Sequence, residues 1–131
     1  MKASWRWIDK QALLILHDES LAEHGGASGL RDEGLLDSAL VRPLNLASYG
    51  TPDAAQLAAA YASGLSQNHA FVDGNKRAAF LALGLLLYLN GYRLTATQAM
   101  ATATILSLAA GELSEEALAD WVRKNSAARA T

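Results

Sequence analysis

Apolar residues recur along most of the chain every three or four positions, the spacing that places them on one face of an α-helix. One stretch departs from this spacing, because residues 78–89 are apolar at almost every position. A helix that is apolar on all sides is expected inside a fold rather than on its surface. Asn90 and Gly91 would end it, since glycine readily takes the left-handed conformation that follows many helices. We therefore expect a buried central helix that begins near Asp73 or Gly74.

The same periodicity predicts about five further helices, and no window alternates with period two over the length of a strand. Asp9 would cap the first helix, which Gly25–Gly26 would end. Asp32 would cap the second, and Pro43 would end it, because the residue before a proline resists helical geometry. Three more helices would begin at Thr51–Pro52, at Thr95 or Thr97, and at Ser114. The expected fold is all-α, with about six helices around the central one.

Three short stretches and one histidine complete this picture. Residues 27–30 and 44–50 would be irregular, and residues 126–131 would form a frayed tail. His17 falls on the mostly apolar stripe of the first helix. It is therefore expected to be a buried histidine that either makes its hydrogen bonds within the core or supports the residues of a functional site.

The composition excludes several classes of protein. The chain has 131 residues, of which 51% are hydrophobic and 18% charged, so we expect one ordered domain with its core in residues 8–125. A formal net charge of −2 disfavours direct binding to nucleic acid. The absence of cysteine excludes disulfides and thiolate chemistry and suits the cytoplasm. No stretch resembles a signal peptide or the roughly 20-residue apolar run of a membrane helix.

A dense polar cluster lies at the start of the expected central helix. The sequence there reads Asn68-His69-Ala70-Phe71-Val72-Asp73-Gly74-Asn75-Lys76-Arg77. The first N–H groups of a helix bind anions, and Lys76 and Arg77 would oppose the helix dipole unless an anion lay beside them. Gly74 would let the backbone approach that anion, and His69 could act as a general base. Asp73 could cap the helix or hold a metal ion. Together these residues predict a phosphate-binding site.

The motif His69-x-Phe71-x-Asp73-Gly74-Asn75-Lys76-Arg77 resembles the core motif of the Fic/Doc superfamily, H-x-F-x-[DE]-G-N-G-R-x-x-R. Lys76 replaces its second glycine and Phe80 its last arginine. Both replacements are typical of the death-on-curing (Doc) branch, the toxins of bacterial toxin–antitoxin pairs. The likeness extends to residues 16–18, 24–26 and 29–40 and covers about positions 12 to 125. It implies an all-α Fic/Doc-like bundle in a single toxin domain.

The resemblance also implies a role for each residue of the motif. His69 would take the proton of an acceptor hydroxyl, Asp73 would hold Mg²⁺, and Phe71 would anchor the loop in the core. The phosphates of ATP would be bound by Gly74, Asn75, Lys76 and Arg77. Residues 44–50 would form a flap for the protein target, unless they are a plain connecting loop.

The two replacements bear on which group would be transferred. Family members with the last arginine transfer AMP, and that arginine binds the outer phosphates of ATP. Phe80 cannot bind phosphates in this way, whereas Lys76 adds a cation to the phosphate site. The resemblance therefore implies a protein kinase that passes the γ-phosphate of ATP to a threonine of elongation factor Tu and stops translation. A Fic-type AMP transferase and a catalytically silent binding module are the alternatives.

A second partner is implied as well. Doc-like toxins are neutralised by an antitoxin whose disordered C-terminal segment folds onto the toxin. Such a segment would dock as an amphipathic helix in an apolar groove. The expected walls of this groove are residues 13–21, 25–30 and 43–49.

Overall fold

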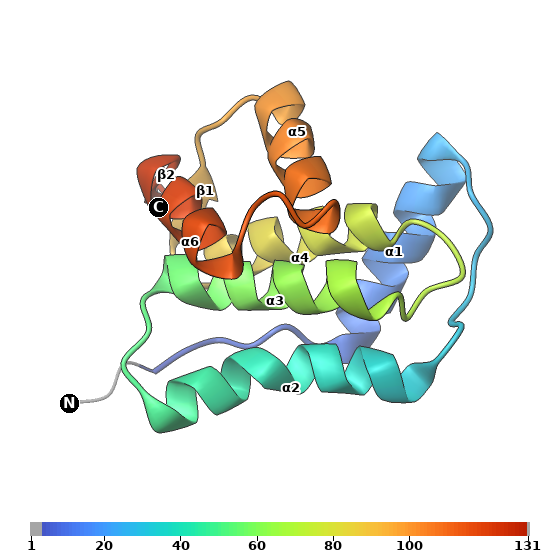
Figure 1. Cartoon of the computed structure of the whole chain (residues 1–131), viewed down its shortest axis with the longest axis horizontal. Coiled ribbons are helices and arrows are strands. Elements are labelled where there is room, and N and C mark those ends of the chain that lie inside the picture. The colour runs from blue at the N-terminus through green and yellow to red at the C-terminus, as the bar shows by residue number, and fades with distance from the viewer. Residues whose placement is uncertain (1–3, 131) are drawn as a thin grey trace.

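The computed structural model describes residues 4–130, which form six helices and one small sheet (Figure 1). In chain order the elements are α1 (Lys10–His24), α2 (Glu33–Tyr49), α3 (Ala54–Asn68), α4 (Asn75–Leu89), β1 (Tyr92–Leu94), α5 (Gln98–Ala109), α6 (Glu115–Lys124) and β2 (Ser126–Ala128). The expected all-α class is confirmed. Within residues 4–130 no helix is long and apolar enough to cross a membrane.

Five of the six helices begin with a side chain that accepts a hydrogen bond from the first turn. These caps are Asp9, Asp32, Asp53, Thr97 and Ser114. The sequence predicted Asp9, Asp32 and Ser114, and it named Thr97 as one of two candidates beside Thr95. It missed Asp53, because it placed the start of α3 at Thr51–Pro52. That start is wrong. Asp53 accepts from the N–H of Gln56 while the Gln56 side chain accepts from Asp53, and this capping box fixes the first turn.

The second helix is longer than the sequence predicted. It continues through Pro43 to Tyr49, so the expected irregular segment over residues 44–50 is wrong. Proline has no N–H, so in a helix it leaves the carbonyl four residues earlier, that of Ala39, without its usual donor. At this point α2 lies so close to α3 that a Cβ built on Gly64 would be 3.2 Å from Ala39 Cα. Close packing against α3 therefore maintains the helix where the local rule predicts a break.

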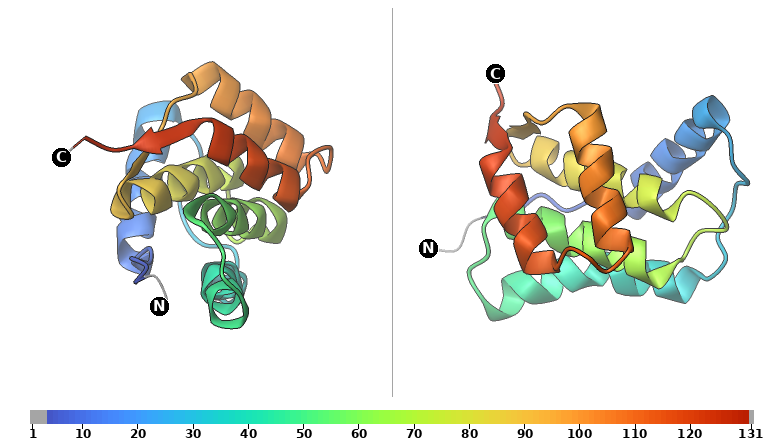
Figure 2. Two further views of the ribbon diagram at one scale, coloured as in Figure 1. Left: turned by 90° about the vertical axis from the view of Figure 1, so that its left-hand side faces the viewer. Right: turned by 45° about the horizontal axis from the view of Figure 1, so that its top comes forward.

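The most completely buried helix is α3 rather than α4. Twelve of the 15 residues of α3 are buried, whereas α4 buries six of its 15 and leaves Tyr88 56% exposed. The prediction of a helix up to Leu89 is confirmed, and the prediction that it is buried on every side is wrong. Because α3 is rich in alanine, its neighbours α2, α4, α5 and α6 can pack closely around it (Figures 1 and 2).

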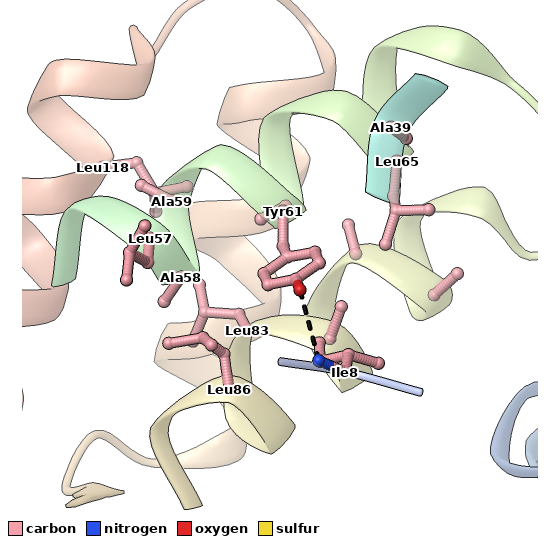
Figure 3. Close-up of a cluster of buried hydrophobic side chains, with 14 of the residues drawn as sticks. Ile8, Ala39, Leu57, Ala58, Ala59, Tyr61, Leu65, Leu83, Leu86 and Leu118 are labelled. Carbon is pink, nitrogen blue, oxygen red and sulfur yellow. Dashed lines mark hydrogen bonds between the residues drawn. The ribbon is translucent and has the colours of Figure 1, made fainter. Parts of the chain in front are cut away.

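The core also ties down the segment before α1. Tyr61, on α3, is fully buried, and its hydroxyl accepts a hydrogen bond of 3.2 Å from the N–H of Ile8 (Figure 3). Ile8 itself is buried in the same cluster of leucines and alanines. This bond fixes the direction from which the chain enters α1.

Residues 126–128 form a strand, which corrects the frayed tail expected over residues 126–131, of which Thr131 lies outside the described residues. β2 pairs antiparallel with β1, Tyr92 opposite Ala128 and Leu94 opposite Ser126. Beyond it, the guanidinium of Arg129 lies 4.2 Å from the centre of the Tyr88 ring. Three-residue strands are too short to show alternation in the sequence, which is why the pattern missed them.

Candidate active site

The polar cluster forms the loop between α3 and α4 together with the first turn of α4. Six residues line one shallow pocket of about 250 Å³: His69, Val72, Asp73, Gly74, Asn75 and Lys76. Lys76 also lines a neighbouring pocket, which contains Arg77. The structure therefore brings five of the predicted site residues into one pocket and places Arg77 next to it.

The N-terminus of α4 opens into this pocket. Among the six helices in residues 4–130, only α4 has no side chain that caps its first turn. Its N-cap residue is Gly74, with φ 74° and ψ 27°, and Asp73 does not take over the role. Instead, Oδ1 of Asp73 accepts from the N–H of Gly74 at 2.8 Å. The N–H groups of residues 75–77 therefore have no side-chain cap, and such groups at a helix N-terminus can bind an anion.

Two cations add to this positive end of the helix. Neither Lys76 nor Arg77 forms an ion pair within residues 4–130. A cation in a first turn opposes the helix dipole and destabilises the helix by about 0.3–1 kcal/mol. A bound phosphate would turn both unfavourable interactions into favourable ones.

His69 follows the last residue of α3 in a left-handed backbone conformation, with φ 52° and ψ 47°. It is the one non-glycine residue of positive φ among residues 4–130, and its side chain is exposed. Arg31 holds this conformation, because its Nε donates to the His69 carbonyl at 2.8 Å and its Nη2 to that of Asn68 at 3.3 Å. No pattern in the sequence indicated this role for Arg31.

The loop that carries His69 pairs with the segment that leads into α2 (Figure 2, right). The N–H groups of Arg31 and Asp32 donate to the carbonyl of Ala70, at 2.7 and 3.1 Å, and Val72 donates to Gly29 at 3.0 Å. Leu30 and Phe71 form a single antiparallel bridge between the two segments. Residues 27–30 were expected to be a plain loop, and this pairing shows that they brace the site.

Asn75 closes the loop over Phe71. Its Oδ1 accepts from the N–H of Phe71 at 3.0 Å, and its Nδ2 donates to the Phe71 carbonyl at 3.1 Å. Phe71 is only 2% exposed, which confirms that it anchors the loop in the core. The Asn75 amide binds the Phe71 backbone through both its oxygen and its nitrogen, which leaves the backbone N–H of Asn75 and the second hydrogen of Nδ2 for a phosphate.

His17 lies directly beneath the loop. It is 1% exposed, its ring centre is 4.0 Å from that of Phe71, and its Nε2 is 3.0 Å from the carbonyl oxygen of Asp73. Burial lowers the pKa of His17. Because a carbonyl oxygen can only accept, Nε2 carries a hydrogen and donates it to Asp73. The expected burial of His17 behind the site is confirmed, but its Nδ1 is buried without a hydrogen-bond partner, so the side chain is only half satisfied.

The loop fits around His17 so closely that Gly74 cannot carry a side chain. A Cβ built on Gly74 would lie 2.8 Å from Cε1 of His17. The positive φ of Gly74 also disfavours any side chain. Both the space and the backbone conformation therefore require glycine at this position.

The carboxylate of Asp73 has room for a cation. Its Oδ1 accepts from Gly74 and its Oδ2 from the N–H of Ala27, at 3.3 Å, which leaves about half of its roughly four lone-pair sites. Residues 4–130 contain no cluster of three or more histidine or carboxylate side chains that could hold a metal. Mg²⁺ binds through one or two carboxylates together with phosphate oxygens and water. Asp73 therefore fits an ion that arrives with a phosphate ligand.

Comparison with known proteins gives a consistent result. Residues 7–87 match the family described as the Fic/DOC family. The chain is 30% identical over 120 residues to "Protein kinase doc" of Escherichia phage P1. The aligned region covers 91% of this chain and 94% of that protein. It is 45% identical over 75 residues to "Toxin Doc" of Mycolicibacterium smegmatis, or 55% of this chain and 57% of that protein. The family match spans all of α1, α2 and α3 and residues 75–87 of α4, and so includes the whole His69 pocket.

Proposed function

The chain belongs to the Fic/DOC family, and from this we propose that it is a Doc-type toxin with protein kinase activity. It would transfer the γ-phosphate of ATP to a hydroxyl group of another protein. The relative named a protein kinase, which is similar along 91% of the chain, supports this proposal. The structural observation that carries it is the exposed His69 in one pocket with the uncapped, positively charged start of α4.

Each part of the pocket has a task in this reaction. The N–H groups of residues 75–77 and the ammonium of Lys76 bind phosphate oxygens and offset their charge. His69 accepts the proton of the acceptor hydroxyl as its oxygen bonds to the γ-phosphorus, and the bond from that phosphorus to ADP breaks. Asp73 would hold Mg²⁺, which, when bound, neutralises charge on the phosphates.

Phe80 favours transfer of phosphate over transfer of AMP. It stands where AMP-transferring members of the superfamily carry an arginine for the outer phosphates, and here it lines the pocket beside Lys76 and Arg77. An apolar ring cannot bind phosphate oxygens. We therefore place AMP transfer second, and a silent binding module third, because the pocket retains its base and its cations.

The acceptor that we propose is a threonine of elongation factor Tu, so that the toxin acts in the cytoplasm by stopping translation. The proposed regulator is an antitoxin whose disordered C-terminal segment folds on the toxin. Two of the three stretches expected to form its groove lie far apart. Residues 25–30 precede the start of α2, whereas residues 43–49 are at the other end of this 17-residue helix, about 25 Å long.

The test uses ATP labelled at either the α- or the γ-phosphate, incubated with the protein, Mg²⁺ and purified elongation factor Tu or a bacterial lysate. We expect label on a protein acceptor from γ-labelled ATP only. Label from the α-phosphate would instead assign AMP transfer. No label from either position, with elongation factor Tu present, would favour the binding module.

A further inference from the structure

Three segments that are far apart in the sequence meet at the end of α4 that lies opposite the His69 pocket. The chain before α1 binds Asn90, because the N–H of Arg6 donates to its Oδ1 at 2.9 Å and its Nδ2 donates to the Arg6 carbonyl at 3.0 Å. The hairpin of β1 and β2 joins them, since the N–H of Arg129 donates to the carbonyl of Gly91 at 2.7 Å. In Figure 1 this end lies at the left and the loop between α3 and α4 at the right. The 15 residues of α4 separate the two ends by about 22 Å.

The three segments are basic, although the whole chain has a net charge of −2. Residues 4–7, 88–95 and 121–130 contain no carboxylate, so all 13 aspartates and glutamates of the chain lie outside them. Their cations are Arg6, Arg93, Arg123, Lys124 and Arg129. Arg123 pairs with Asp53 and Asp120, whereas the other four form no ion pair within residues 4–130. The net charge alone disfavoured nucleic acid as a partner, but it hides this separation of positive from negative charge.

The hairpin places two of these cations on the same face. Arg93 is opposite Ala127 in the register, and side chains alternate along a strand, so Arg93 shares its face with position 129. The guanidinium of Arg129 lies 4.2 Å from the centre of the Tyr88 ring, which brings this face to the last turn of α4. Tyr88 is nevertheless 56% exposed, and Arg6 and Arg93 are exposed as well. We call Arg6, Arg93 and Arg129 the arginine patch.

We propose that the arginine patch binds single-stranded nucleic acid. Guanidinium groups bind phosphate oxygens through two parallel hydrogen bonds, and an exposed aromatic ring such as Tyr88 offers a surface on which an unpaired base can stack. An acidic peptide would use the arginines but not the ring. A membrane fits less well, because Trp5 and Trp7, the large side chains that could insert, pack against the core.

This site is independent of the proposed kinase activity. It lies at the C-terminal end of α4, whereas the phosphate-binding groups lie at its N-terminal end. A strand bound to the arginine patch therefore leaves the His69 pocket open. The protein should bind nucleic acid and ATP at the same time.

The first test measures the binding of labelled oligouridine and oligothymidine, each of about 12 nucleotides, to the full chain by fluorescence anisotropy. Both should bind with a Kd on the order of 10⁻⁵–10⁻⁴ M at low salt, and a duplex of the same length should bind more weakly, because its bases are already stacked. Combining Arg6→Gln with Arg93→Gln should weaken binding at least about tenfold. The slope of log K against log salt should fall by about 1.4, or about 0.7 for each lost phosphate contact.

The matched control combines Lys10→Gln with Arg42→Gln. It changes the net charge by the same amount, but Lys10 pairs with Glu33 and Asp37, and Arg42 pairs with Glu115. Because carboxylates already neutralise these cations, the control should bind both oligonucleotides as the wild type does.

The second test separates the base from the phosphates. Tyr88→Ala should weaken oligonucleotide binding at least about fivefold, the lower range of lost base stacking, and leave the binding of inorganic polyphosphate unchanged. Tyr49→Ala is the control, since Tyr49 is a tyrosine of α2 that is 91% exposed, and it should change neither.

Four results would overturn the proposal. A wild-type chain that binds neither oligonucleotide has no such site. Equal weakening in the two double variants would show that only net charge matters. Displacement of the oligonucleotide by ATP with Mg²⁺ would place it at the start of α4 instead. Polyglutamate that binds as tightly as the oligonucleotides would assign the arginine patch to an acidic protein partner.

Discussion

Nε2 of His17 lies 3.0 Å from the carbonyl oxygen of Asp73, so a buried residue of α1 holds the backbone of the loop that carries His69. The two residues are 56 positions apart in the sequence. The bond runs to the backbone and leaves the Asp73 carboxylate to face the pocket. Replacing His17 should therefore disturb the site without removing any group that touches a substrate.

The first prediction compares His17→Gln with His17→Leu. Glutamine keeps an N–H donor near the position of Nε2, whereas leucine leaves the Asp73 carbonyl without a donor, a loss worth about 1–3 kcal/mol of stability. The leucine variant should lose about 10- to 100-fold in kcat, with KM for ATP changed less, because the loop shifts. The glutamine variant should recover most of this rate. Equal losses in both variants, measured at matched folded fractions by urea denaturation, would show that His17 only fills space.

The second prediction concerns His69 as the general base. His69→Asn keeps a side chain that tolerates the left-handed backbone, and it should lower γ-phosphate transfer by about 10²–10⁴-fold while the fold survives. His24→Asn is the matched control, since His24 is also exposed and lies outside the pocket. Turnover within twofold of wild type in His69→Asn would remove the histidine from the mechanism.

The third prediction separates two reasons why Gly74 is glycine. Gly74 and Gly111 have nearly the same φ, 74° and 79°, but a Cβ meets His17 at Gly74 and open space at Gly111. Gly111→Ala should reduce the free energy of unfolding by about 1–2 kcal/mol, the strain of a left-handed alanine. Gly74→Ala should cost roughly 1–3 kcal/mol more, because it also crowds His17. Similar losses in the two variants, measured by thermal or urea unfolding, would mean that the loop simply moves aside.

The fourth prediction concerns stability in acid. Burial alone would raise the pKa of Asp53, but its bonds to Arg123 and to the Gln56 N–H outweigh burial and hold the pKa below the usual 3.8. A depressed carboxyl pKa gives stability that is present above the unfolded pKa and is lost as the pH falls through the folded one. The protein should therefore lose stability below about pH 4, and Arg123→Gln should reduce this dependence. Urea denaturation from about pH 6 to pH 3 measures how the free energy of unfolding depends on pH. Arg93→Gln is the control, since Arg93 has no ion pair within residues 4–130.

The sequence predicted the parts of the fold that depend on short-range chemistry. Asp9, Asp32 and Ser114 cap helices because the groups that they bind are three residues away. The composition of the polar cluster was visible for the same reason, since His69 and Lys76 are only seven positions apart.

Features that depend on packing were missed. Pro43 should end a helix by local rules, and only the contact of α2 with α3 keeps that helix intact. Alanine is only weakly hydrophobic, so the alanine-rich α3 did not stand out in the sequence pattern. The pattern therefore predicted α4 as the central helix, whereas in the structure α3 is more completely buried. The support of His69 by Arg31 joins residues 38 positions apart, and no periodicity reports such a contact.

That distance along the chain has a consequence for synthesis on the ribosome. The backbone bonds between residues 29–32 and residues 70–72 close a loop that contains all of α2 and α3. Contacts with such long sequence separation form late, because the entropy of closing the loop must be overcome before they add stability. A nascent chain that has exposed only α1 and α2 holds Arg31, but His69, whose carbonyl Arg31 binds, has not yet emerged. The pocket can arise only after the first turn of α4 has left the exit tunnel, so a shorter nascent chain lacks the complete lining of the His69 pocket.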